Sequence, residues 1–259
     1  MSEMREPEAE VRADVPRRSV PVVAVVLAAG LGVRFDVDNP KQLFRVGGKP
    51  IVAWSIEAFE ANPDVTDILL VVNDRVRPAV EKIVADNGYP KVRMIIQGGE
   101  ERVDSTEAAL QTLAGSGIPA DAKILIHDAV RPFVSQESIT GCIEALDSFS
   151  AVTVAVPSTD TILFARDLGE RKVVRDVPDR DNMFRAQTPQ AFRFDTLRQA
   201  YARAATDPEF HPTDDTRVVV DYLPDEPVAI VAGNETNLKV TLSSDIPIAE
   251  WIARSLLGE

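Results

Sequence analysis

The stretch VVAVVLAAGLGVRF, from Val22 to Phe35, decides the fold of this chain. Residues Val22–Ala28 form a continuous apolar run, which predicts the first strand of a parallel sheet buried on both faces. The run ends in Ala28-Ala29-Gly30-Leu31-Gly32, where small side chains and two glycines let backbone N–H groups approach a ligand closely. Arg34 and Lys41 place two cations beside this loop. Exposed amides and fixed cations together favour the binding of a polyphosphate.

Two common phosphate-binding motifs do not fit this stretch. A Walker A loop needs Gly-Lys followed by Ser or Thr, but Gly48-Lys49 is followed by Pro50. The dinucleotide fingerprint needs a third glycine where this chain has Phe35, and an acidic residue about 20 positions further on, which residues 53–56 do not supply. Taken alone, the two glycines could equally form a plain turn after the strand.

Strand-like apolar runs alternate with helix-like stretches along most of the chain. The further strands that we expect are Ile68–Val72, Val92–Ile96, Lys123–His127, Val152–Val156, Val228–Ala232 and Leu238–Thr241. The helices that we expect are Pro50–Ala61, Val76–Asp86, Val103–Leu113, Ser135–Leu146 with Ser135 as N-cap, Asp195–Ala205 and Asp245–Leu257. The alternation predicts an α/β fold with a doubly wound, mostly parallel, Rossmann-like sheet, in which ligands bind beyond the carboxyl ends of the strands.

A different pattern follows Pro157. Two β-like runs, Asp160–Ala165 and Arg171–Val177, predict a hairpin and therefore a protruding β-arm at about residues 158–180. The hairpin has little apolar content of its own, so we expect it to pack on something else.

Composition narrows the classes of function. The chain has 259 residues, a net charge of −13 and one cysteine, Cys142. The acidic balance argues against nucleic-acid or anionic-membrane partners. A single cysteine forms no internal disulfide and suits a reducing cytosol, so we expect a cytoplasmic protein. His127 and His211 are the only histidines, so we expect no structural zinc site and take His127 to be a packed residue. Residues 1–20 mix acidic and basic side chains without an apolar core, which predicts a disordered tail before a domain at 21–259.

Four further segments carry polar residues without an evident structural purpose. Gly98-Gly99 follow an expected strand and would either approach a ligand or form a flexible turn. Asp128 follows a buried strand, where it could bind a metal ion or pair with Arg131. Residues 186–192 would form a rigid loop that reads hydroxyl groups, or lead into the next helix. Lys239 lies in an expected core strand, where it needs a partner such as a phosphate unless it reaches solvent from an edge.

Taken together and in order, these segments resemble the family of CTP-dependent alditol-phosphate cytidylyltransferases, above all its 2-C-methyl-D-erythritol 4-phosphate branch. The matching runs are LAAGLGVRF with PKQ, GGEERVDS, HDAVRP, TDT, AQTPQAF, TDD and TNLKVT. The resemblance implies that a phosphate oxygen of the acceptor attacks the α-phosphorus of CTP and that pyrophosphate leaves, in isoprenoid precursor synthesis. It also implies Mg²⁺ or another divalent cation, and a homodimer with exchanged β-arms.

The resemblance further implies roles for individual residues. The catalytic cations would be Arg34, Lys41 and Lys239, and Asp128 would hold the metal ion. The residues implied to bind CTP are Ala28, Ala29, Gly30, Gly32, Gly99, Glu100 and Ser105. The residues implied to bind the acceptor are Arg131, Thr161, Arg180 and Thr188, of which Thr161 and Arg180 would reach the neighbouring subunit's site from the arm.

Some residues depart from the pattern of the methylerythritol branch. The departures are Leu27 in place of Pro, Glu100 in place of Asp, and Leu163-Phe164 where many relatives carry Lys. Val130, Pro178 and Leu238 are similar to the ribitol 5-phosphate branch. We expect 2-C-methyl-D-erythritol 4-phosphate as the acceptor, with D-ribitol 5-phosphate as the alternative. A CTP-sensing module without chemistry is the alternative from another class, and the joint presence of Lys41, Asp128 and Lys239 argues against it.

Overall fold

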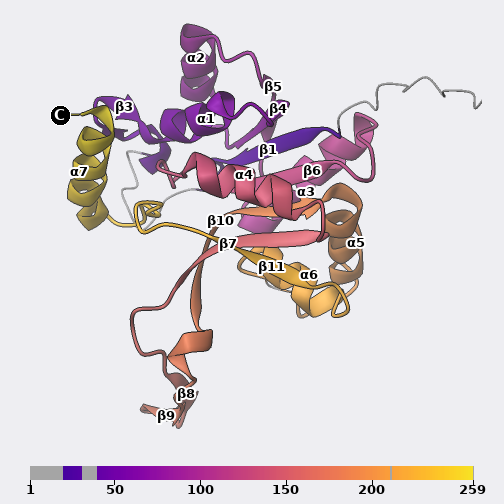
Figure 1. The fold of residues 1–259 in the computed structure, drawn as a ribbon, viewed down its shortest axis with the longest axis vertical. Coiled ribbons are helices and arrows are strands. Elements are labelled where there is room, and N and C mark those ends of the chain that lie inside the picture. Colours follow the sequence, from indigo (N-terminus) through magenta and orange to yellow (C-terminus); the bar gives the residue numbers. More distant parts are fainter. Residues whose placement is uncertain (1–19, 31–39, 211, 259) are drawn as a thin grey trace, which may run out of the picture.

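A seven-stranded sheet forms the centre of the molecule, and a β-arm projects away from it (Figure 1). The computed structural model describes residues 20–30, 40–210 and 212–258. In spatial order the strands are β11 (Val228–Ala232), β7 (Ala151–Pro157), β10 (Phe184–Arg193), β6 (Lys123–Asp128), β1 (Val22–Leu27), β4 (Asp67–Val72) and β5 (Val92–Gln97). Neighbouring strands run parallel except where β10 pairs with β6 and β7. The predicted doubly wound, mostly parallel sheet is confirmed.

The side chains of β1 show why the sheet is buried on both faces. Val22, Ala24 and Val26 point into one apolar core, while Val23 and Val25 point into the other. The first core is covered by α1 (Ile51–Ala61), α2 (Arg77–Asn87) and α4 (Gln136–Ala145). The second core is covered by α3 (Arg102–Gly115), α5 (Phe194–Ala204) and α6 (Asp215–Tyr222). The period of two along a strand thus distributes apolar side chains to both layers of helices.

The carboxyl-terminal part of the chain packs beside α1. There α7 (Ile246–Leu257) forms a third apolar cluster with residues of a small hairpin made of β2 (Arg45–Val46) and β3 (Lys49–Pro50). Three short 3-10 helices complete the elements of the described residues: η1 (Lys41–Leu43), η2 (Arg180–Asn182) and η3 (Ser243–Asp245). The predicted N-cap of α4 is confirmed, because the Ser135 side chain accepts a hydrogen bond from the backbone N–H of Ser138 at 3.2 Å. None of the described helices is long and apolar enough to cross a membrane.

The expectation for residues 186–192 is wrong. They are neither a loop nor a lead-in to a helix but part of β10, in the middle of the sheet. Pro189 is tolerated because the pairing of β10 with β7 shifts its register between Ala186 and Gln190, so that the proline lies in an irregular stretch of the ladder. Because its buried Gln and Thr side chains are polar, this strand has a sequence pattern that is typical of a loop.

One other expectation fails, and one helix was not expected. Residues 238–241 form no strand, so Lys239 lies on an irregular segment rather than in a core strand. Helix α6 was not anticipated, although it begins within the TDD motif at Asp215. The tail expected at residues 1–20 lies almost entirely outside the described residues, and the domain limits stay predictions.

The arm leaves the sheet at the end of β7 and returns as β10. Its tip is an antiparallel hairpin of β8 (Phe164–Asp167) and β9 (Lys172–Asp176), which confirms the predicted β-arm, although residues 160–163 are not part of the strand. Its large apolar side chains are exposed, among them Leu163 at 54%, Phe164 at 57% and Val174 at 56%. Within one chain nothing in the described structure covers this apolar surface.

Candidate active site

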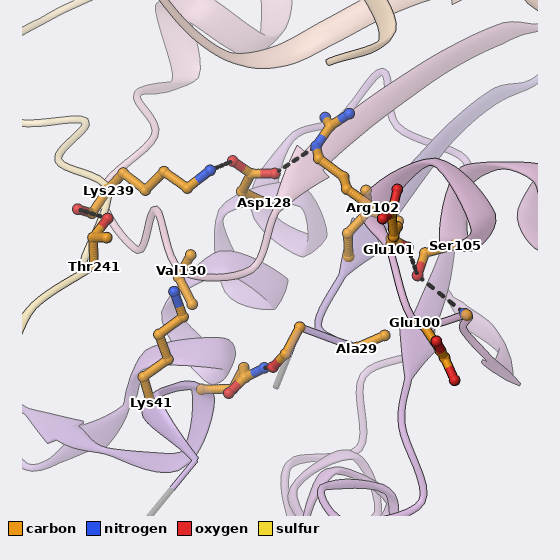
Figure 2. A pocket seen from close by; sticks show the side chains of 14 residues that line it. Ala29, Lys41, Glu100, Glu101, Arg102, Ser105, Asp128, Val130, Lys239 and Thr241 are labelled. Carbon is orange, nitrogen blue, oxygen red and sulfur yellow. Dashed lines mark hydrogen bonds and ion pairs between the residues drawn. The ribbon is translucent and has the colours of Figure 1, made fainter. Parts of the chain in front are cut away.

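A cavity of about 260 Å³ opens at the carboxyl ends of the parallel strands (Figure 2). The residues predicted for the site that line this cavity are Ala29, Gly30, Lys41, Gly99, Glu100, Ser105, Asp128 and Lys239. Residues at the ends of β1, β5 and β6 therefore meet here, as the direction of the parallel strands requires, and Lys239 joins them from an irregular segment. Ala28 lies just behind the lining and is buried. Gly32 and Arg34 lie outside the described residues.

The loop after β1 is held by side-chain amides from other segments. The buried Gln42 amide donates to the carbonyls of Ala28 at 2.8 Å and Gly30 at 2.5 Å. Asn73 donates in the same way to the carbonyl of Ala29 at 2.7 Å. Three successive carbonyls are thus bound from the protein side. Because Gln42 follows Lys41 in η1, the same contacts place the lysine at the cavity.

The glycine loop after β5 is packed tightly against the protein. A Cβ added to Gly98 would lie 2.5 Å from the Cβ of Ala29 and 2.7 Å from Ser105 Oγ, and one added to Gly99 would lie 2.1 Å from the Cβ of Asp104. The buried Ser105 hydroxyl accepts from the Gly99 N–H at 3.3 Å. These glycines are therefore needed for close packing between the loop, the first strand and the start of α3, rather than for flexibility.

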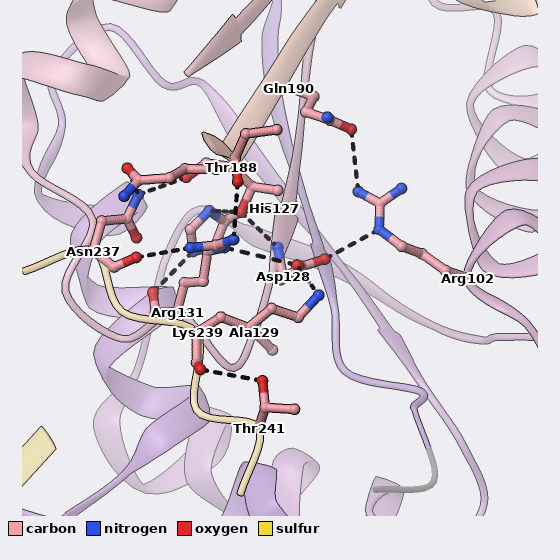
Figure 3. A network of polar contacts seen from close by, with 12 residues as sticks. Arg102, His127, Asp128, Ala129, Arg131, Thr188, Gln190, Asn237, Lys239 and Thr241 are labelled. Atoms are coloured by element: carbon pink, nitrogen blue, oxygen red, sulfur yellow. Dashed lines mark hydrogen bonds and ion pairs between the residues drawn. The ribbon is translucent and has the colours of Figure 1, made fainter. Parts of the chain in front are cut away.

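Asp128, the last residue of β6, lies at the centre of a cationic cluster (Figure 3). Its Oδ1 is 3.1 Å from Arg102 Nε, and its Oδ2 is 2.8 Å from Lys239 Nζ and 3.8 Å from Arg131 Nε. Burial alone would raise the pKa of this carboxyl, but the charges of Arg102, Lys239 and Arg131 hold the pKa well below its usual range. Asp128 is therefore ionised throughout the physiological range.

The cluster shows which ion pairs these residues form within the protein. The ion pair between Asp128 and Arg131 exists, yet its 3.8 Å separation is the longest of the three. The charge partner of Lys239 in the protein is Asp128 itself. Sequence reasoning missed Arg102, although its position between a double glycine and a helix start was a usable signal.

A hydrogen-bonded chain behind Asp128 fixes the end of β6 to β10. The Asp128 N–H donates to Thr188 Oγ1 at 3.1 Å, and the Thr188 hydroxyl lies 2.9 Å from Nδ1 of the fully buried His127. His127 Nε2 lies 3.0 Å from the carbonyl oxygen of Arg131. A neutral ring with its hydrogen on Nε2 satisfies all three contacts, because Nδ1 then accepts from the threonine. Burial lowers the pKa of His127 to about 4, so the ring is neutral, and its full burial confirms the packed residue expected from the sequence.

A second cavity of about 130 Å³ adjoins the first. Arg102, Asp128 and Lys239 line both cavities, and we call these three residues the shared wall. Arg131 and Thr188, both predicted to contact the acceptor, line only the second cavity. The Arg131 guanidinium is held there by the carbonyl of Asn237 at 2.8 Å.

The two predicted arm residues are not brought to these cavities within one chain. Thr161 and Arg180 are exposed on the arm, and neither lines the first or the second cavity. Any contribution from them would therefore come from another copy of the chain.

The shared wall offers one carboxylate to a metal ion, so such an ion would take most of its ligands from a bound phosphate compound and water. In the described part of the chain, no three side chains of His, Cys, Asp or Glu gather closely enough to hold a metal ion. Asp128 offers one ionised carboxylate beside a cavity suited to phosphates. Mg²⁺ is commonly held by one or two carboxylates together with phosphate oxygens and water. The residues thus fit a Mg²⁺ ion bound mainly through a nucleoside triphosphate.

Comparison with known proteins gives consistent results. The model of the IspD family, described as 2-C-methyl-D-erythritol 4-phosphate cytidylyltransferase, matches residues 22–255. A protein of that name from Bifidobacterium longum is 69% identical, over 94% of this chain and 84% of the relative. The bifunctional ribulose 5-phosphate reductase/CDP-ribitol pyrophosphorylase Bcs1 of Haemophilus influenzae is 36% identical, over 90% of this chain and 48% of the relative. The crystal structure of 4-diphosphocytidyl-2C-methyl-D-erythritol synthase from Anaerococcus prevotii superposes with a TM-score of 0.78 at 27% identity, covering 93% of this chain and 97% of that chain.

Proposed function

The chain belongs to the 2-C-methyl-D-erythritol 4-phosphate cytidylyltransferase family, and we propose that it transfers the cytidylyl group of CTP to the phosphate of 2-C-methyl-D-erythritol 4-phosphate, with release of pyrophosphate. The observation that carries this proposal is the shared wall, where three charged residues separate two adjoining cavities. A reaction that joins two phosphates needs two anion sites in contact with each other. The product of this transfer serves the synthesis of isoprenoid precursors.

The chemistry requires no nucleophile from the protein. An oxygen of the acceptor phosphate attacks the α-phosphorus of CTP, and the bond from that phosphorus to the oxygen bridging to the β-phosphorus breaks. A phosphate monoester is already largely ionised at neutral pH, so no general base is needed. The task of the protein is to hold two anions in line and to stabilise the charge of the transition state.

The larger cavity suits CTP. It is lined by the loop after β1 and by the loop at Gly99, whose backbones are held rigidly by contacts on their protein side. Lys41 and Lys239 line the same cavity and would bind the triphosphate and the α-phosphoryl group. Arg34 is assigned to the triphosphate from the sequence resemblance alone.

The smaller cavity suits the acceptor. Arg131 and Thr188 line it beside the shared wall, so an acceptor phosphate there would lie next to the α-phosphorus. Mg²⁺ bound with the triphosphate would neutralise part of its charge, and Asp128 is the residue placed to hold that ion. The ion pairs of Asp128 with Arg102 and Lys239 would then rearrange.

We assign the arm to a homodimer that acts in the cytoplasm. Apolar side chains such as Leu163, Phe164 and Val174 are exposed on it and would be covered by a partner subunit. Thr161 and Arg180 would complete the partner's acceptor site, which explains why they lie away from both cavities of their own chain.

One specific observation favours a second acceptor. The Haemophilus relative carries CDP-ribitol pyrophosphorylase in its name, and Val130 and Leu238 beside the site are similar to that branch. The sequence identity is 69% to the Bifidobacterium protein and only 36% to the Haemophilus relative, which favours methylerythritol phosphate as the acceptor.

The decisive experiment measures kcat/KM for 2-C-methyl-D-erythritol 4-phosphate and for D-ribitol 5-phosphate by pyrophosphate release, at the same CTP and Mg²⁺ concentrations. We expect the methylerythritol substrate to give the higher value. Lys239→Ala serves as the control, because a contaminating enzyme would leave its rate unchanged. A higher value for D-ribitol 5-phosphate would replace the acceptor, and CTP binding without turnover of either acceptor would identify a sensor.

A further inference from the structure

Arg102 is the residue of the shared wall to which neither the sequence resemblance nor the proposed mechanism assigns a role. It is the first residue of α3, and its side chain is about one-fifth exposed, at 21%. Its guanidinium contacts three groups: Asp128 Oδ1 at 3.1 Å from Nε, Asp215 Oδ2 at 2.5 Å from Nη1, and Gln190 Oε1 at 3.5 Å from Nη2. The third contact is long, so the two carboxylates hold this side chain in place.

The second of these carboxylates belongs to a fully buried residue. Asp215 begins α6 and has no exposed surface, and its other oxygen accepts a hydrogen bond from the hydroxyl of Tyr201 at 2.5 Å. Its backbone N–H donates to Gln190 Oε1 at 3.0 Å. A buried carboxylate that is bound on both oxygens cannot follow a moving partner, so the Asp215–Tyr201 pair fixes the guanidinium in one orientation.

The three contacts leave some hydrogens of the Arg102 guanidinium without a partner among these groups. A guanidinium carries five N–H groups, and the three contacts above use one on each nitrogen. One hydrogen on each Nη is therefore left over, and the side chain lines both cavities. Further N–H groups on a guanidinium that lines a cavity can donate to phosphate oxygens, which arginine commonly binds.

The surrounding charges favour the acceptor's phosphate as this ligand. Arg102, Arg131 and Lys239 carry three positive charges against the two negative charges of Asp128 and Asp215, and all but Asp215 line the smaller cavity. Lys41, which belongs to the larger cavity only, lies well apart from Arg102 in Figure 2.

The further carboxylate of the smaller cavity does not oppose a phosphate there. Asp214 lines that cavity, but its side chain caps α6 by accepting from the backbone N–H of Arg217 at 2.8 Å. Its negative charge is therefore directed toward the positive end of a helix.

We propose that Arg102 binds the phosphate of the acceptor directly, and that the buried Asp215–Tyr201 pair is its positioning device. This inference rests on the proposed function. Arg102 is thereby a catalytic residue, because the phosphate that it binds carries the attacking oxygen. Asp215 and Tyr201 act only through it. Lysine cannot replace Arg102, because an ammonium group that contacts both Asp128 and Asp215 has only one of its three N–H groups left for a phosphate.

The test measures KM and kcat separately for the acceptor and for CTP in three variants. Arg102→Lys should lower kcat/KM for the acceptor by about 10²-fold and leave KM for CTP within about twofold, as expected for the loss of one charged contact. Tyr201→Phe should lower the same acceptor parameter by about fivefold, because the hydroxyl acts through Asp215. The control is Tyr222→Phe, which removes a similar Tyr–Asp hydrogen bond, from Tyr222 to Asp207 at 2.8 Å. It should change neither KM nor kcat for either substrate.

Each outcome decides the inference. An unchanged kcat/KM for the acceptor in Arg102→Lys, or a KM for CTP that rises as much as the KM for the acceptor, would overturn the role of Arg102 at the acceptor. If Arg102→Lys does not fold, Tyr201→Phe carries the test, since an effect no larger than that of Tyr222→Phe would remove the positioning device. Wild-type protein that transfers cytidylyl groups while the variants fail these expectations refutes only this inference, whereas wild-type protein without any transfer refutes the proposed function.

Discussion

His127 should make the protein lose stability in mild acid. The fully buried ring stays neutral in the folded protein, where burial lowers its pKa to about 4, whereas an unfolded histidine has a pKa of about 6.5. Between these two pH values the unfolded chain binds a proton that the folded chain does not, so stability falls as the pH falls. At about 1.4 kcal/mol per pH unit, the loss between pH 7 and pH 5 sums to about 2 kcal/mol, and it stops growing below about pH 4.

The assay is equilibrium unfolding in urea at pH 7 and at pH 5, applied to the wild type and to His127→Gln. The variant loses the contacts to Thr188 and Arg131 and should be less stable at pH 7, but its free energy of unfolding should fall by about 2 kcal/mol less between the two pH values. The chain has only two histidines, so His211→Gln measures the contribution of the other one. An equal loss in the wild type and in His127→Gln would refute the reasoning, since His127 would then not be held neutral.

Three further predictions concern the site. Lys41→Ala and Lys239→Ala should each lower the rate by at least about 10²-fold with an unchanged circular dichroism spectrum, because each removes a cation that lines the larger cavity; an unchanged rate would exclude that lysine from the site. EDTA should abolish pyrophosphate release and Mg²⁺ restore it, and full activity in excess EDTA would contradict the metal role of Asp128. After subunit exchange, a mixture of Arg180→Ala and Lys41→Ala protomers should be more active than either parent if the arm acts on the partner's site, and no gain would rule this out.

The predicted fold succeeded where apolar side chains decide the structure. The strands β1, β4 and β6 are almost entirely buried, so their apolar runs marked them directly. The prediction failed at β10. Its buried Gln187, Thr188 and Gln190 side chains form hydrogen bonds with residues far away in the sequence, so the local pattern is typical of a polar loop. Tertiary hydrogen bonds override the local pattern there.

The site was predictable as far as strand direction allows. Residues that follow parallel strands meet at one edge, which is why Asp128 and the loop at Gly99 line the same cavity. The ion pairs themselves were not predictable: Arg102 contacts Asp215 across 113 positions of sequence, and no local pattern records such a partner. The approach of Lys239 to Asp128 likewise depends on an irregular segment whose path only tertiary contacts define.

The place where the arm is inserted has a consequence for how this chain can change during evolution. The arm joins β7 to β10, two strands that already lie side by side in the sheet, so topologically it is one long hairpin connection. The entropy of closing such a connection grows slowly, by about 0.6 kcal/mol for each doubling of its length. Insertions, deletions and recombination within the arm therefore leave the register of the sheet and the shared wall intact. Selection can therefore change the residues exposed on the arm without changing the folding of the sheet from which it projects.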